Sequence, residues 1–221
     1  MKKDYIKNII ICILSLVSMV FVPSLIAGEL IKFNLNSMVI TAISDMLFLA
    51  ILIIVFFKDI VKDLKTFFKN FNKSIFGSFK WYFLGVSLMV IFNLIINSLM
   101  GSISDNEALV RSMIYKFPTV SFICVAVLAP LIEEIVFRKS VMKCTKNKWI
   151  GSFICAFLFG FAHVMSYLSD FTNIIYILPY AALGFSFAMM DYESDTVFSS
   201  VIYHALHNTF SFIVILGLGA L

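Results

Sequence analysis

The sequence predicts an all-α fold, a polytopic bundle of about seven membrane-spanning helices with the N-terminus inside. Apolar residues make up 61% of the 221 residues and charged residues only 14%, whereas ordinary globular domains average about 45–50% and about 25%. The apolar residues form runs of about 20 residues, the length of helix that crosses a hydrocarbon core of about 30 Å. Lys and Arg fall mainly between alternate runs, which is typical of a multi-pass protein with one orientation.

This composition excludes several classes of protein. Phe occurs 25 times, whereas Gly and Pro occur 9 and 4 times, so the chain is neither disordered nor collagen-like. The formal net charge of +4 comes from basic residues whose positions indicate the orientation of a membrane protein. We therefore expect no nucleic-acid partner. The cysteines lack paired or metal-knuckle spacing, so we interpret them as small buried hydrophobic residues. They are Cys12, Cys124, Cys144 and Cys155.

Seven apolar runs are the predicted spans. They cover approximately residues 8–27, 39–57, 81–100, 119–137, 150–168, 171–190 and 197–216. The first run follows Lys2, Lys3 and Lys7, an arrangement that signal peptides share. Its apolar stretch exceeds the roughly 7–15 residues of a signal-peptide core, and further spans follow, so we expect an uncleaved anchor.

The distribution of basic residues predicts the orientation. All but three of the 17 Lys and Arg residues lie in the N-terminal tail, the 58–80 linker or the 138–148 loop, and the positive-inside rule assigns these segments to the inner side. The exceptions are Lys32, Arg111 and Lys116. Seven spans then place the C-terminus outside. The last inner loop, 191–195, carries no basic residue and supports this orientation only weakly.

The chain divides into two predicted regions. Residues 1–118 contain N-terminal spans and an amphipathic linker without a recognisable motif, and residues 119–216 contain the chemistry-bearing helices. In the 58–80 linker, lysines alternate with apolar residues at helical spacing, which predicts a helix on the anionic inner leaflet. We interpret it as a membrane-bound connector; a regulatory element is the alternative. The outer loop 101–118 is expected to be solvated.

Ionisable residues inside a span are costly, so each needs a partner or a function. The fourth run ends with Glu133, Glu134 and Arg138. Glu134 and Arg138 are four residues apart and are predicted to form an ion pair on one helix face. Glu133 points about 100° away from Glu134 and requires another partner. The alternative is that both glutamates simply contact lipid headgroups.

The other two polar clusters lie in the fifth and seventh runs. His163 is the one ionisable residue in its run, and the seventh run contains His204, His207 and Asn208 within about one turn. Each histidine alone is typical of hydrogen bonding between helices. Together with the glutamates, they predict one polar cavity where three helices converge. Asp45 in the second run has no sequence neighbour to pair with, and we interpret it as a stability feature more readily than as part of this cavity.

These residues resemble the three motifs of the CPBP family, the CAAX prenyl endopeptidases and bacteriocin-processing proteins, also called the Abi family of intramembrane proteases. The motifs are Glu-Glu-x-x-x-Arg (Glu133, Glu134, Arg138), Phe-x-x-x-His (Phe159, His163) and His-x-x-x-Asn (His204, Asn208). The resemblance covers about residues 119–212. Lys139, where relatives often have a small residue, and the additional His207 depart from the pattern.

The resemblance and the residue chemistry imply the same catalytic assignment. Glu133 is the candidate general base for a water molecule, and His163 holds that water or transfers its proton. His204 and Asn208 are candidate donors to the oxyanion. Glu134, Arg138, Phe159 and His207 are expected to support these residues.

Zinc is the alternative mechanism. Glu133, His163 and His204 are the candidate ligands, with an open position for water. Because H-E-x-x-H is absent and Asn is a poor zinc ligand, we prefer a reaction without a metal cofactor.

The predicted function is an endopeptidase of the cell (plasma) membrane that cleaves a small membrane-associated peptide or protein, such as a bacteriocin or a pheromone. The partners implied are the lipid bilayer and this substrate. A non-enzymatic scaffold or bacteriocin-immunity protein is the alternative, and the lack of an internal repeat disfavours a transporter.

The predicted cavity requires the fourth helix to continue toward Met142 or the fifth to begin after Ile150. Otherwise Glu133 lies about 7 Å from the inner end of its span and His163 about 20 Å.

Overall fold

The computed structural model describes residues 2–145 and 147–218, and Lys146 of the predicted inner loop lies outside the described residues. The described chain is helical and contains no strand. Seven of its helical segments are long and apolar enough to cross a membrane, so the predicted multi-pass helical fold is confirmed. They are Tyr5–Phe33, Ser37–Val55, Phe71–Met100, Pro118–Cys144, Lys148–Tyr167, Phe171–Ser194 and Phe198–Gly217.

Single α-helices form most of six of the seven spans. They are α1 (Lys2–Leu30), α2 (Ser37–Val55), α5 (Phe79–Met100), α9 (Lys148–Val164), α10 (Ile177–Ser194) and α11 (Phe198–Leu218). Shorter elements complete the chain: η1 (Ile31–Phe33), α3 (Phe57–Lys69), α4 (Phe71–Ile75), α6 (Asp105–Lys116), η5 (Met165–Tyr167) and η6 (Phe171–Tyr176).

The fourth span is irregular. It consists of α7 (Pro118–Phe122), the π-helical η2 (Ile123–Leu128), α8 (Ala129–Glu134), the π-helical η3 (Ile135–Ser140) and the 3₁₀ turn η4 (Val141–Cys144). Two π-helical segments in one span are unusual, because π-helix is rare and occurs frequently at functional sites. Both glutamates of the predicted cavity lie in α8, between these segments.

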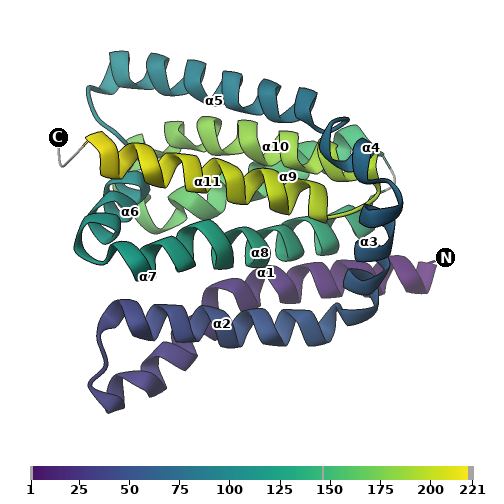
Figure 1. The fold of residues 1–221 in the computed structure, drawn as a ribbon, viewed down its shortest axis with the longest axis horizontal. Helices are drawn as coiled ribbons and strands as arrows, with labels where there is room; N and C mark the ends of the chain where they lie inside the picture. The colour runs from purple at the N-terminus through teal and green to yellow at the C-terminus, as the bar shows by residue number, and fades with distance from the viewer. Residues whose placement is uncertain (1, 146, 219–221) are drawn as a thin grey trace.

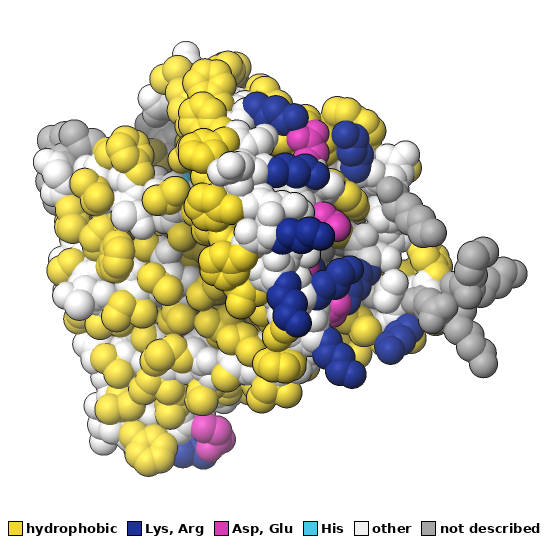
Figure 2. All heavy atoms as spheres, turned by 45° about the vertical axis from the view of Figure 1, so that its right-hand side comes forward, with side chains coloured by type: hydrophobic (Ala, Val, Ile, Leu, Met, Phe, Trp, Pro, Cys, Tyr) yellow, Lys and Arg dark blue, Asp and Glu magenta, His cyan; other side chains and the backbone are white. Residues whose placement is uncertain are grey.

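Consecutive spans run antiparallel to each other, and α1 begins at the opposite end of the bundle from the end of α11 (Figure 1). The α1–α2 pair lies on one side of the bundle, and the last turns of α1, beyond Pro23, tilt away from it (Figure 1). Proline removes a helical hydrogen bond and commonly bends a helix. Lys and Arg gather in a band at the α3 end (Figure 2). The assignment of that end to the inner side stays a prediction.

Gly160 of α9 and Gly184 of α10 allow these two helices to pack closely against each other. A Cβ atom on Gly160 would lie 2.7 Å from the Ile177 carbonyl oxygen, and one on Gly184 would lie 2.9 Å from the Phe159 Cβ atom. Such approaches are typical of membrane helix interfaces, where packing rather than hydrophobicity drives association. The close contact sets the position of Phe159 and, one turn later, of His163.

Three predicted loops are largely helical. The fourth span continues through Arg138 to Cys144, so the 138–148 loop is much shorter than predicted. This extension is one of the two that the predicted cavity required, because it places Glu133 about 16 Å from the inner end of its span. The 101–118 segment, expected to be simply solvated, forms α6, which begins at the N-cap Ser104. Helix α10 extends to Ser194, so Asp191 lies in a helix and is buried.

We predict that Gly160→Ala destabilises the bundle by about 1–3 kcal/mol, because the added methyl group meets a backbone carbonyl that cannot rotate away. Thermal unfolding in detergent micelles measures the change. Gly28→Ala is the matched control, since nothing lies within 4 Å of the position that its Cβ atom would take and alanine favours helix. Equal unfolding temperatures for Gly160→Ala and the unchanged protein would contradict the close packing.

Candidate active site

Pro130 explains how the fourth span meets α11. The Ala129 N–H bonds to the Cys124 carbonyl in the π-helical pattern of η2. The next bond in that pattern would join Pro130 to the Val125 carbonyl, but proline has no N–H. The Asn208 side chain supplies the missing donor, at 2.8 Å from the Val125 oxygen. One N–H of the Asn208 amide is therefore committed to the backbone, and the second remains available.

A buried ion pair lies one turn further along the span. Glu134 and Arg138 are 0% and 1% exposed, and the Glu134 Oε2 atom lies 2.9 Å from the Arg138 Nε atom. The predicted pair on one helix face is therefore present. The other oxygen, Oε1, lies 2.9 Å from the His204 Nδ1 atom. Because a carboxylate oxygen accepts, the His204 Nδ1–H donates, and the pair connects the fourth span to α11.

Glu133 faces the two histidines. Its Oε2 atom lies 3.9 Å from the His204 Nε2 atom and 4.0 Å from the His163 Nε2 atom. The His163 Nδ1 atom lies 2.8 Å from the Phe159 carbonyl oxygen, so Nδ1 carries a proton and donates it. In the neutral rings, both Nε2 atoms therefore present a lone pair toward Glu133.

Aromatic rings surround these groups. The Phe159 ring lies 4.5 Å from the His163 ring, and the Phe187 ring stacks on His204 at 4.8 Å between centroids. The Arg138 Cζ atom lies 5.5 Å and 6.0 Å from the centroids of Phe159 and Phe187. These contacts exclude water from the ion pair and restrict the rotation of both imidazoles.

Tyr180 connects the cavity to the start of α6. Its ring stacks on His163 with centroids 4.4 Å apart. The Tyr180 hydroxyl lies 3.1 Å from the Ser104 hydroxyl oxygen, and the Asn106 amide donates to it at 3.1 Å. Ser104 and Asn106 lie at the start of α6, so this helix positions the ring against which His163 rests.

The structure brings together most of the predicted site residues. Glu133, Glu134, Arg138, Phe159, His163 and His204 form one contiguous cluster. Asn208 contacts Val125 on the neighbouring span. His207 turns instead toward Tyr82 of α5, with ring centroids 6.2 Å apart, and contacts neither glutamate among the described residues. Asp45 interacts electrostatically with Glu133. It therefore lies near the cavity, which is the second of the two interpretations given for it above.

Sequence reasoning missed Tyr180 and Phe187. Aromatic residues are ordinary in a membrane span, and only their seven-residue spacing on one face of α10 indicated a shared role. It also missed Asp191, which accepts hydrogen bonds from the Ser200 N–H and hydroxyl at 3.2 Å and 2.9 Å. The sequence does contain a signal for Asp191, because this carboxylate directly follows the apolar run.

The donor set gives a test of the zinc alternative. Ligands of a tetrahedral zinc ion lie about 3.4 Å apart, whereas Glu133 lies 3.9 Å and 4.0 Å from its two histidine nitrogens. Within residues 2–145 and 147–218, no group of three His, Cys, Asp or Glu side chains is arranged to hold a metal ion. In this arrangement the three groups would have to move closer to bind zinc.

Comparisons with known proteins find a matching family model and a relative. Residues 115–210 match the family model described as Type II CAAX prenyl endopeptidase Rce1-like. Over 147 residues the chain is 25% identical to a Bacillus subtilis (strain 168) protein named "Putative membrane peptidase YdiL". The alignment covers 65% of the chain and 51% of that relative, so the chain spans about half the length of the curated relative that it matches. No solved structure matches the chain.

We predict that Arg138→Met lowers the free energy of unfolding by about 3–5 kcal/mol, because it leaves the Glu134 charge buried without its partner. Glu134→Gln in the same chain should recover much of the loss, since it removes that charge. Unfolding in detergent of both single variants and the double variant gives the coupling energy. Additive effects would show that the two side chains do not stabilise each other.

Proposed function

We propose that this chain is an intramembrane endopeptidase, because residues 115–210 match the family model of Type II CAAX prenyl endopeptidase Rce1-like proteins. The observation that carries the proposal is the position of Glu133, whose Oε2 atom lies about equally far from two imidazole nitrogens at 3.9 Å and 4.0 Å. A carboxylate beside two lone pairs, inside an apolar bundle, suits the activation of a water molecule.

The distances fit a water molecule held between these groups. A water oxygen about 2.8 Å from both the Glu133 oxygen and a histidine nitrogen would subtend an angle of about 90° between them. It would donate one hydrogen to Glu133 and the other to the His163 Nε2 atom, which is bare because Nδ1 bonds to Phe159. In this proposal Glu133 takes the first proton as the water attacks the peptide carbonyl, and the proton then passes to the departing amine.

The oxyanion requires a donor, and the hydrogen bonds limit the candidates. Asn208 has one N–H left after its bond to Val125. His204 uses Nδ1–H on Glu134, so it donates from Nε2 only as an imidazolium. Glu134, Arg138 and Phe159 then act by positioning His204 and His163. We assign no catalytic part to His207, which faces Tyr82.

The proposed substrate is a small membrane-associated peptide or protein, of the kind exemplified by bacteriocin precursors and peptide pheromones. The site lies among helices that each cross the membrane, so a substrate already at the bilayer reaches it without leaving the lipid surface. Glu133 and His163 retain 13% and 19% side-chain exposure, whereas Glu134 is fully buried. The cavity is therefore more open to the surroundings at His163 and Glu133 than at Glu134.

A non-enzymatic scaffold is the second candidate, and a specific observation favours it. The Glu134 carboxylate connects Arg138 and His204, which is what polar residues do when they only hold membrane helices together. Glu133 separates the two candidates, because no hydrogen bond of the described chain depends on it. A scaffold tolerates its loss, and an enzyme does not.

We predict that Glu133→Gln lowers the rate of cleavage at least about 100-fold, because an amide cannot accept the proton of water. The assay is turnover of a membrane peptide by the protein reconstituted in liposomes. Glu29→Gln is the matched control, because this exposed glutamate of α1 pairs with Lys32. Unchanged turnover in Glu133→Gln and His163→Ala, with both variants folded, would contradict the protease proposal and favour the scaffold.

We further predict that strict chelation leaves turnover unchanged. The reaction as proposed uses only side chains and water, and the donor separations exceed those of a zinc site by about half an ångström. Activity that falls with a chelator and returns with zinc would instead identify Glu133, His163 and His204 as metal ligands.

A further inference from the structure

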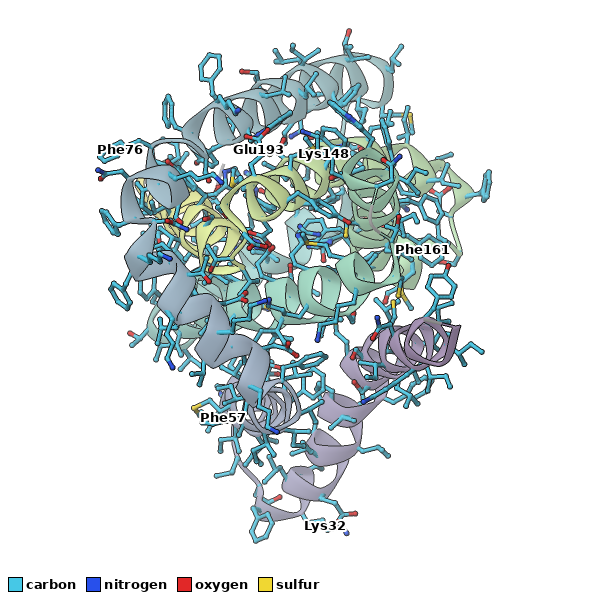
Figure 3. All side chains as sticks on the ribbon, turned by 90° about the vertical axis from the view of Figure 1, so that its right-hand side faces the viewer. Lys32, Phe57, Phe76, Lys148, Phe161 and Glu193 are labelled. Carbon is cyan, nitrogen blue, oxygen red and sulfur yellow. The ribbon has the colours of Figure 1, made fainter. Side chains whose placement is uncertain are left out.

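Helix α3 has a face that packs on the protein and a second, apolar face that does not. At about 100° per residue, Asp63 and Phe67 point toward the bundle, and they are 3% and 6% exposed. About 90° further round the helix lie Phe57, Leu64 and Phe68, which are 59%, 40% and 69% exposed. Phe57 lies at the boundary of the molecule when the bundle is viewed from the α3 end (Figure 3).

A third face of α3 consists of lysines. Lys58, Lys62, Lys65 and Lys69 fall within an arc of about 60°. Together with Val61 and Thr66 they line a shallow groove of about 340 Å³ that contains no carboxylate. Figure 2 shows basic side chains in a row beside exposed apolar ones at this end of the molecule.

The two acidic residues of α3 do not line this groove. Asp59 pairs with Lys143, and Asp63 pairs with Lys139, both on the fourth span. Asp63 also accepts a hydrogen bond from the Val197 N–H at 2.9 Å. In the part of the chain that the structure describes, none of the four groove lysines forms an ion pair. Four like charges on one short face destabilise each other unless an anion lies between them.

We propose that the lysine groove of α3 is a binding site for the phosphate-bearing headgroups of anionic phospholipids. The adjoining Phe57, Leu64 and Phe68 enter the acyl-chain boundary, which brings the lysines to the level of the lipid phosphates. An interfacial helix has this geometry, with a buried apolar edge and basic residues beside it. The exposed apolar face selects a lipid headgroup over a soluble anion, since a free phosphate would leave three large side chains in water.

The test is lipid binding by the full-length protein in detergent, measured by native mass spectrometry. Phosphatidylglycerol should bind and phosphatidylcholine should not. Each lysine near an anionic surface contributes about fivefold to the binding constant, so the triple variant Lys62→Gln, Lys65→Gln, Lys69→Gln should bind phosphatidylglycerol about 100-fold more weakly. The corresponding Lys→Arg triple variant should bind as tightly as the unchanged protein.

The control makes the same change in charge elsewhere. Lys32→Gln, Arg111→Gln, Lys116→Gln removes three positive charges outside the groove and should leave binding unchanged. Equal loss in both triple variants would show that net charge alone attracts the lipid and would overturn the proposal. So would binding of phosphatidylcholine at equal strength, or displacement of the lipid by millimolar inorganic phosphate. Because no readout is enzymatic, these outcomes are independent of the proposed protease activity.

Discussion

The burial of one ion pair organises the C-terminal half of this protein. Glu134 and Arg138 are taken almost completely out of water, and neither charge is tolerable in an apolar bundle without the other. The guanidinium lies near the rings of Phe159 and Phe187, and the carboxylate accepts a hydrogen bond from His204. Four spans therefore meet at this pair. Glu133 follows from it, because the preceding position on the helix points about 100° away, toward the histidines.

The spans and the polar cluster were predictable from the sequence because both depend on strong physical constraints. A run of about 20 apolar residues has few alternatives to a membrane helix, and an ionisable residue within one must find a partner. Glu134 and Arg138 met this expectation, as did the proximity of Glu133 to His163 and His204. The catalytic roles of these residues stay predictions.

Other features depend on contacts that leave little trace in a single sequence. Tyr180 and Phe187 contribute rings to the cavity, but an aromatic residue in a span is too common to indicate such a role. The solvated composition of the 101–118 segment concealed α6, whose first turn holds Tyr180 in place. The partner of Asn208 depends on a carbonyl freed by the π-helical turn, and Pro130 alone did not reveal that turn. His207 lies beside Tyr82, because sequence proximity to His204 does not determine which face of α11 a neighbour occupies.

The π-helical segments also bear on how this region tolerates changes in length. Each one accommodates a residue that a regular α-helix would not, with its displaced carbonyls satisfied by side chains such as Asn208 and Cys155. Removing a single residue from η2 would restore ordinary α-helix, and the segments on either side would keep their orientation because the π-helical turn had absorbed that residue. A one-residue deletion in α8, which has no such turn, would instead rotate the two halves of the span by about 100° relative to each other. The fourth span therefore tolerates a change of length in η2 that it does not tolerate next to the glutamates.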